Sequence, residues 1–223
     1  MKSAQNSTTS VLRIFRREAS VEVLGPGRRA VIWVQGCPFA CKNCIVPESW
    51  DSEGGEPVAV EDLAAWALAQ PDIEGVTFSG GEPMAQAEAL ATLVDRIRAQ
   101  ADFGVVCYTG YVYEHLLKHG TPGQKALLAR TDLLIDGVYI EREHAALRWR
   151  GSANQRLLAL TERYRAEIEK IAHGADQPAG MQFFMAPDGR IAYAGVPPKP
   201  GFREEFAARM ANLGIALQSG KEG

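Results

Sequence analysis

Three of the four cysteines in the chain lie in one short stretch, Gly36-Cys37-Pro38-Phe39-Ala40-Cys41-Lys42-Asn43-Cys44. Their spacing is C-x3-C-x2-C, and the apolar run 30–34 directly before them predicts a buried strand. We therefore expect the cysteines on a loop that leaves the C-terminal end of that strand. Three thiolates on such a loop can hold three irons of a cubic 4Fe–4S cluster, which leaves the fourth iron without a protein ligand. Another molecule must then bind that iron.

A zinc site, a disulfide and a buried core cluster are the alternatives for these cysteines. Structural zinc usually has four ligands, and the first histidine after the cysteines is His115. A disulfide would leave one of the three cysteines unpaired, and residues 1–10 are polar and unlike a secretory signal. A core cluster would require neither this spacing nor the turn residues Pro38 and Asn43. The pattern favours the iron–sulfur interpretation.

A second motif, Ser79-Gly80-Gly81-Glu82-Pro83, follows the apolar run 75–78 and precedes a helical pattern. Two glycines allow a ligand to approach the backbone closely, and the carboxylate of Glu82 is able to meet an ammonium group. A plain turn between a strand and a helix also favours Gly and Pro. Taken alone, the motif leaves both interpretations open.

Three further polar residues are candidates for ligand contacts. Thr109 and Asp136 each follow an apolar run, so a hydroxyl and a carboxylate are expected at two strand ends. Asp136 could bind a ribose or orient Arg150, whose guanidinium can bind a carboxylate with two hydrogen bonds. The structural alternatives are turn formation at Thr109 and Asp136, and, for the stretch around Arg150, capping by Ser152 or Asn154 of a helix predicted to begin near Gln155.

Three other residues are expected to be structural. His115 and His119 share a helix face but have no third ligand nearby, so a surface pair is the better interpretation. Cys107 lies inside an apolar run and is expected in the core.

Strands and helices are predicted to alternate along most of the chain. Short apolar runs predict strands, and apolar residues at helical spacing predict helices between them. The strands are 30–34, 75–78, 103–108 and 133–135; the helices are 60–70, 86–100, 111–119 and 124–130. This order indicates an α/β protein with a parallel sheet, open or rolled into a partial barrel. Ligands of such sheets bind at the C-terminal strand ends, where this chain carries Gly and polar residues.

The composition excludes some functions. The chain has 223 residues and a formal net charge of −3, so charge gives no support for a nucleic-acid partner. No apolar stretch approaches the length that spans a membrane. We expect a cytosolic protein, where cysteines stay reduced.

Three segments are expected. Residues 1–10 are predicted to be disordered, 11–156 to form the core, and 157–223 to form a small α+β extension. Short β-like runs at 11–15 and 21–24 predict a hairpin, and 45–57 a loop. In the extension we predict a helix over 157–172, a hairpin of 181–186 and 190–194 around Pro187-Asp188-Gly189, and a helix over 201–213. The extension has no second cysteine cluster; it is expected to dock a partner, to cap the sheet, or simply to complete the core.

The cysteine spacing and the Gly80-Gly81-Glu82 motif together resemble the radical S-adenosylmethionine (SAM) superfamily. Further stretches over residues 11–156 resemble, more narrowly, the activating proteins of anaerobic (class III) ribonucleoside-triphosphate reductases. These stretches are Gly25-Pro26-Gly27, Gln35-Gly36-Cys37, Pro47-Glu48-Ser49-Trp50, Tyr108-Thr109-Gly110-Tyr111, Leu134-Ile135-Asp136-Gly137 and Trp149-Arg150-Gly151-Ser152-Ala153-Asn154-Gln155.

The resemblance implies a fold, a cluster and a set of SAM contacts. The fold would be a partial (β/α)6-type open barrel with the small extension added. Cys37, Cys41 and Cys44 would hold the 4Fe–4S cluster, and SAM would chelate the fourth iron. The candidate SAM contacts are Asn43, Cys44, Ile45, Ser79, Gly80, Gly81, Glu82, Thr109, Asp136 and Arg150. Asn43 stands where an aromatic residue is common in this superfamily, so adenine must find its contact elsewhere.

The resemblance also implies a reaction. Reductive cleavage of SAM would give a 5′-deoxyadenosyl radical, which would take a hydrogen atom from a glycine of the partner reductase. No catalytic side chain is needed, because the cluster and SAM carry the chemistry. A flavodoxin- or ferredoxin-like protein would supply one electron. The alternatives are a radical SAM enzyme that modifies a small molecule or peptide, and a non-catalytic iron–sulfur protein, which the Gly80-Gly81-Glu82 motif disfavours.

Overall fold

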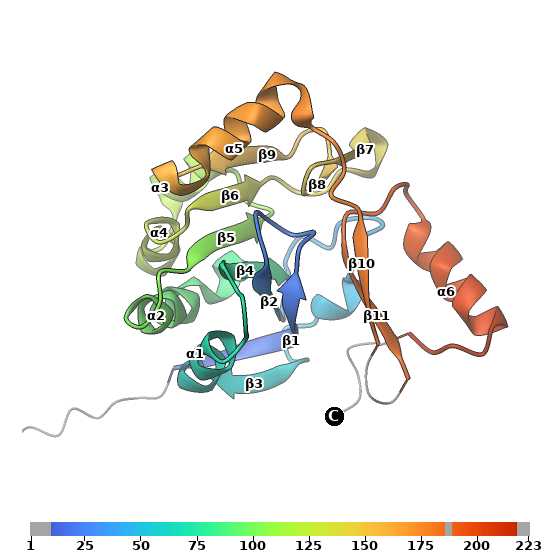
Figure 1. Cartoon of the computed structure of the whole chain (residues 1–223), viewed down its shortest axis with the longest axis horizontal. Helices are drawn as coiled ribbons and strands as arrows, with labels where there is room; N and C mark the ends of the chain where they lie inside the picture. Colours follow the sequence, from blue (N-terminus) through green and yellow to red (C-terminus); the bar gives the residue numbers. More distant parts are fainter. Residues whose placement is uncertain (1–9, 186–188, 218–223) are drawn as a thin grey trace, which may run out of the picture.

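A computed structural model describes residues 10–185 and 189–217 of the chain (Figure 1). Apart from Ser10, the predicted disorder of residues 1–10 lies outside the described residues, as does most of the Pro187-Asp188-Gly189 turn. Within the described residues, none of the helices combines the length and the apolar character required to cross a membrane.

A seven-stranded sheet in the order β3-β1-β2-β4-β5-β6-β9 organises the fold. Its centre is formed by four parallel strands, β2 (Arg29–Val34), β4 (Gly75–Gly80), β5 (Gly104–Thr109) and β6 (Leu133–Asp136). Antiparallel strands flank this centre: β1 (Val11–Val21), β3 (Glu56–Ala59) and β9 (Arg156–Ala159). The predicted α/β class and the four predicted strands are confirmed. The described residues contain four parallel strands, so this topology does not establish a barrel of six β/α units.

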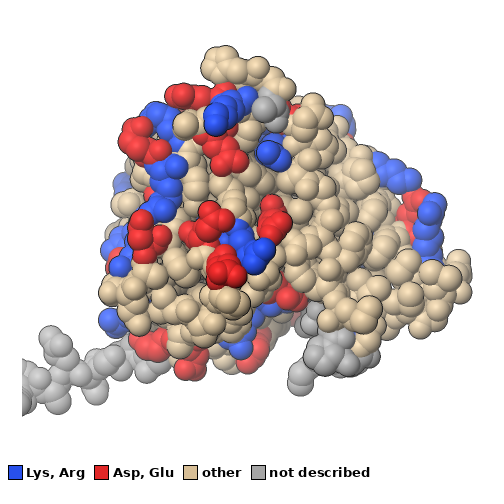
Figure 2. Space-filling model, viewed as in Figure 1, with Lys and Arg blue, Asp and Glu red and all other residues tan. Residues whose placement is uncertain are grey.

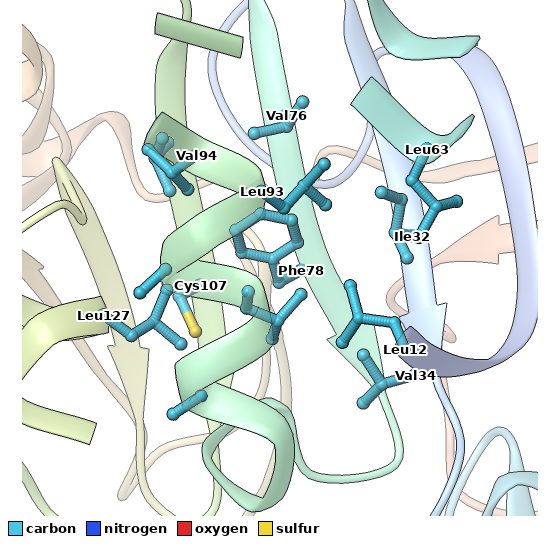
Figure 3. Packing of buried hydrophobic residues seen from close by; sticks show 14 of the residues in the cluster. Leu12, Ile32, Val34, Leu63, Val76, Phe78, Leu93, Val94, Cys107 and Leu127 are labelled. Atoms are coloured by element: carbon cyan, nitrogen blue, oxygen red, sulfur yellow. The ribbon is translucent and has the colours of Figure 1, made fainter. Parts of the chain in front are cut away.

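Helices cover one face of the sheet. They are α1 (Val60–Leu68), α2 (Ala87–Arg98), α3 (Tyr113–His119) and α4 (Pro122–Leu128). The apolar face predicted for α2 is confirmed, because Leu90, Leu93, Val94 and Ile97 are buried against the sheet. Figure 3 shows Leu93 close to Phe78 of β4, with Cys107 of β5 in the same core.

The opposite face of the sheet is covered by segments that follow β6. These are β7 (His144–Leu147), β8 (Arg150–Ser152), α5 (Arg165–Lys170) and the hairpin β10 (Met181–Met185) and β11 (Ile191–Gly195); α6 (Phe202–Asn212) lies on the outer side of the hairpin (Figure 1). Successive strand residues point to opposite faces of a sheet. Ile32 of β2 packs on the helix-covered face, so its neighbour Trp33 points to the other face, where it packs with Ala194 of β11. Val106 and Ile135 pack here against Ile171. The sheet is thus buried on both faces, as parallel sheets generally are.

Short helical turns complete the described chain. They are η1 (Pro47–Ser49), η2 (Pro83–Gln86), η3 (Glu141–Glu143), η4 (Glu162–Tyr164) and the π-type segment η5 (Ile171–Ala175).

Several predicted elements are wrong in detail. The hairpin predicted from 11–15 and 21–24 is not formed: residues 11–21 are one strand, β1, which is irregular where Ser20 adopts a left-handed conformation (φ 59°), and residues 22–24 are not in a strand. The loop predicted over 45–57 contains η1 and the start of β3, which pairs with β1.

The helix predicted over 157–172 begins instead as strand β9, because pairing with β6 outweighs a local helical pattern. No helix begins at Gln155, and the helical part of this range is limited to η4, α5 and the start of η5. The hairpin and the last helix of the extension are confirmed as β10, β11 and α6. The boundary predicted after residue 156 remains a prediction, although the sheet itself includes β9.

Candidate functional site

A cavity lies beside the C-terminal ends of the parallel strands. It encloses about 1110 Å³ of empty space, part of it open to solvent, which suits a ligand of the size of a nucleotide. Most of the residues predicted to form the site line it: Cys37, Cys41, Asn43, Cys44, Ile45, Ser79, Gly80, Gly81, Glu82 and Thr109. The structure therefore brings the cysteine loop and the Gly80-Gly81-Glu82 turn together, as expected for neighbouring strand ends.

The cysteine loop is closed at its base by backbone hydrogen bonds. Gly36 N donates to Ser49 O at 2.8 Å and Cys37 N donates to Trp50 O at 3.1 Å. Within the loop, Ala40 (φ 46°) and Asn43 (φ 56°) adopt left-handed conformations that few residues other than glycine favour. This geometry folds the loop back on itself and places its cysteines at the cavity.

The three thiols are free and half-buried. Burial raises the pKa of the Cys37 and Cys41 thiols. Hydrogen bonds from backbone amides lower these pKa values: the amides of Phe39 and Ala40 act on Cys37, and the amide of Tyr139 acts on Cys41. Hydrogen bonds from amides to sulfur are a feature of iron–sulfur sites. Among the described residues, no three His, Cys, Asp or Glu side chains are arranged as a metal site. The donor set thus fits a cluster by its chemistry, and the ligand geometry remains a prediction.

Cys107 has a different environment. It is fully buried in β5, and burial raises the pKa of its thiol well above the usual value. The expectation that it belongs to the core is confirmed.

The carboxylate of Glu82 is buried beneath the cavity, with only 1 % of the residue exposed. One oxygen accepts hydrogen bonds from Met84 N and Thr109 Oγ1, both at 2.8 Å, and the other accepts from Gly110 N at 2.8 Å. Burial raises the pKa of Glu82 to about 7, although the three hydrogen-bond donors act to lower it. Glu82 therefore fastens the turn after β4 to the end of β5, and its contact with the SAM ammonium group remains a prediction.

Gly81 is required by packing against the cysteine loop. A Cβ atom at this position would lie 2.3 Å from Gly36 O and 3.0 Å from Ser49 O. Gly81 N donates to Val34 O, and Glu82 N donates to Gly36 O, each at 2.8 Å. The glycine motif and the cysteine loop consequently form one backbone-bonded unit, a reason for the glycine that does not involve a ligand.

Asp136 and Arg150 do not line the cavity. Asp136 is 1 % exposed; it accepts hydrogen bonds from Tyr113 N at 2.8 Å and from Arg156 Nε at 2.9 Å. Arg150 forms an ion pair with Asp176 instead of being oriented by Asp136. In this structure both side chains hold elements of the fold together, and their contacts with SAM remain predictions.

The side chain of Asn43 is directed to a residue that the sequence analysis did not single out. Its amide donates to the carboxylate of Glu141 in η3, which also pairs with Lys42 Nζ at 2.7 Å. The cysteine loop is thereby tied to the segment after β6. No local pattern signals Glu141, because its partners lie about a hundred positions earlier in the chain.

Two further groups of lining residues were not predicted. One comes from the segment after β6, with Tyr139, His144 and Trp149 among its members. The other comes from the extension, namely Gly195, Val196, Pro197, Lys199, Pro200, Gly201, Phe202, Arg203 and Glu204. Their residue types carry no chemical signature, so only the three-dimensional structure reveals them.

Comparison with known proteins agrees with the cysteine pattern. Residues 23–158 match the model of a family described as "4Fe-4S single cluster domain". The chain is 35 % identical over 142 residues to an anaerobic ribonucleoside-triphosphate reductase-activating protein of Haemophilus influenzae. The aligned residues cover 59 % of this chain and 87 % of that protein. The corresponding protein of Vibrio cholerae is 36 % identical over 141 residues, covering 60 % of this chain and 88 % of its own length.

A second kind of activating enzyme is also similar. The pyruvate formate-lyase-activating enzyme of Clostridium pasteurianum is 36 % identical over 115 residues, which is 48 % of each chain. The family match ends at residue 158, so most of the extension lies outside it.

Proposed function

The chain belongs to the family of 4Fe–4S single cluster domains and to that of the anaerobic ribonucleoside-triphosphate reductase-activating proteins, and on this premise we propose that it generates a glycyl radical on a partner enzyme. The partner would be an anaerobic ribonucleotide reductase. One observation carries the proposal: three free thiols on one loop share a cavity with the Gly80-Gly81-Glu82 turn.

Cys37, Cys41 and Cys44 would hold the cluster, and the cavity would hold SAM. With these groups bound, the site would supply one-electron radical chemistry that takes a hydrogen atom from a glycine Cα of the partner, with methionine and 5′-deoxyadenosine as the other products. The chain's own residues would position the cluster and SAM and shield them. The backbone unit of the cysteine loop and the turn after β4 fixes the loop, and Glu82 fixes that turn to β5. No side chain has to act as an acid or base, since a hydrogen atom is transferred.

Other parts of the proposal follow from the same chemistry. Cytosolic conditions would keep the three thiols reduced, and a flavodoxin- or ferredoxin-like donor would supply the electron. The four parallel strands would be part of an open barrel of the radical SAM kind, with its ligand at the C-terminal strand ends.

Anaerobic reconstitution tests the proposal. The iron-loaded protein is reduced with dithionite, mixed with SAM and assayed for 5′-deoxyadenosine by chromatography. A candidate reductase is then added, and electron paramagnetic resonance is used to detect a glycyl doublet. Both signals are expected. An intact cluster that yields no 5′-deoxyadenosine would refute SAM cleavage and favour a non-catalytic iron–sulfur protein.

A second candidate function is the modification of a small molecule or peptide. It is favoured by the residues of the extension that line the cavity, because they leave less room for a protein loop. Formation of 5′-deoxyadenosine without any glycyl doublet on the reductase would support this candidate over the first.

A further inference from the structure

Residues 195–204, named here the extension wall, form one side of the cavity. Nine of these ten residues line it, together with residues of the cysteine loop and of the strand ends. They lie well beyond residue 158, where the family match ends. This chain therefore closes its cavity with a segment that the matched region does not supply.

The extension wall is held against the cysteine loop by side chains. Arg203 forms an ion pair with Glu48 of η1, the turn that follows Cys44 and Ile45. Behind the wall, Arg16 Nη2 donates to Tyr193 O at 2.8 Å and so joins β11 to β1. The wall is thus fixed to the same loop that carries the thiols.

Helix α6 does not complete the core. None of its residues is fully buried, and it lies outside the hairpin in Figure 1. Its charged side chains lie at the right edge of Figure 2, whereas the surface over β10 and β11 is largely uncharged. Ala192 and Ala194 of the hairpin are buried, whereas α6 is joined to the hairpin through half-buried aromatic rings.

The ring of Phe202 is prearranged at the start of α6. It is stacked on Phe206 with centroids 5.5 Å apart and planes at 10°, and it meets Tyr193 edge-on at 6.3 Å and 90°. Phe206 covers one face of this ring, and Phe202 itself lines the cavity. An aromatic ring supported in this way is a surface on which a planar base can stack.

Other rings at the cavity are less available. Phe39 meets Tyr111 edge-on at 4.9 Å and packs against Gly110, where an added Cβ would come within 2.5 Å of the ring. Trp149 is only 3 % exposed, and Tyr139 meets His144 edge-on at 5.9 Å. Among these cavity rings, Phe202 has a stacked backing ring and is only half-buried.

We propose that the extension wall is part of the SAM-binding site and that Phe202 is the ring on which the adenine of SAM stacks. The proposal rests on the proposed function, because it requires SAM to occupy the cavity. It assigns to the extension a binding role that the family-matched region does not provide.

Isothermal titration of SAM into the anaerobically reconstituted protein tests this assignment. Stacking of a base on an aromatic ring corresponds to roughly a 5- to 150-fold change in affinity, so Phe202→Ala should raise the Kd of SAM by that factor. Phe202→Tyr keeps the ring and should bind SAM like the wild type. Phe202→Leu keeps apolar volume without a ring and should bind more weakly than Phe202→Tyr.

Phe183→Ala is the matched control. Phe183 belongs to the same aromatic cluster, with its centroid 5.3 Å from that of Phe206, but it does not line the cavity. Its substitution should leave the Kd of SAM unchanged. If Phe202→Ala does not fold, as judged by circular dichroism, the comparison of Phe202→Leu with Phe202→Tyr decides the question.

The outcomes separate this inference from the proposed function. A Kd within twofold of wild type for both Phe202→Ala and Phe202→Leu, while the wild type binds and cleaves SAM, would overturn the inference alone. Failure of the wild type to bind SAM would overturn both.

Discussion

The buried carboxylate of Glu82 predicts an unusual dependence of stability on pH. Its pKa is about 7 in the folded protein and about 4.5 when exposed, because burial disfavours the charged form. Between these values the folded state binds one more proton than the unfolded state, so the free energy of unfolding falls as pH rises. The stabilising contribution is complete below pH 4.5 and is lost by about pH 7.

The size of the effect follows from linkage. Each pH unit changes the free energy of unfolding by about 1.4 kcal/mol, so the interval from 4.5 to about 7 removes about 3 kcal/mol. Glu82→Gln cannot titrate and should lose this part of the pH dependence. It also replaces an acceptor oxygen with an NH2 group, which costs about 1–3 kcal/mol at all pH values, because one of the three donors loses its partner.

Urea denaturation of both proteins between pH 4.5 and pH 8 measures the difference. Contributions from all other groups cancel when the variant is subtracted from the wild type. The difference should fall by about 3 kcal/mol over the interval and stay constant above it. Parallel profiles for the two proteins would refute the argument that burial dominates the pKa of Glu82.

Three further predictions concern the cavity walls. Gly81→Ala should lower the free energy of unfolding by about 2 kcal/mol or more, since its Cβ meets the backbone of the cysteine loop; a change below about 0.5 kcal/mol in urea denaturation would contradict this packing. Cys41→Ala should abolish the release of 5′-deoxyadenosine, whereas Cys107→Ala should retain it; equal release by both variants would defeat the assignment of the ligands. Arg203→Glu should raise the Kd of SAM, because it breaks the ion pair that holds the extension wall to Glu48. The double variant with Glu48→Arg should restore the Kd of SAM, because it re-forms an ion pair of opposite polarity. If the double variant binds SAM as weakly as Arg203→Glu, this ion pair does not hold the wall in place.

The central sheet could be predicted because its signals are local. The runs ending at Val34, Phe78 and Tyr108 are apolar and short, and each is followed by Gly or a polar turn. Burial on both faces of a parallel sheet requires such runs. The positions of the three thiols and of the glycine turn followed from the strand ends to which they are attached.

The edges of the fold could not be predicted in the same way. Leu157 and Leu158 fit a helical pattern, but pairing with β6 makes them a strand. Ser20 adopts a left-handed conformation inside β1, so the strand looks interrupted in the sequence. Both outcomes depend on partners that are distant in the chain.

The candidate site was incomplete for the same reason. Asp136 looked like a ligand contact, and its partner Arg156 becomes evident only when β9 lies beside β6. Phe202 has no motif around it, and its place at the cavity depends on the hairpin and on Glu48. A residue type can predict chemistry, but it cannot predict which distant segment closes a cavity.

The most direct test of the central claim is Mössbauer and electron paramagnetic resonance spectroscopy of the protein prepared without oxygen, before and after addition of SAM. We expect about four irons per chain in a cubic cluster held by Cys37, Cys41 and Cys44, with a spectrum that changes when SAM binds the fourth iron. Tetrahedral zinc in the cysteine loop, or a cluster spectrum that SAM leaves unchanged, would contradict this expectation.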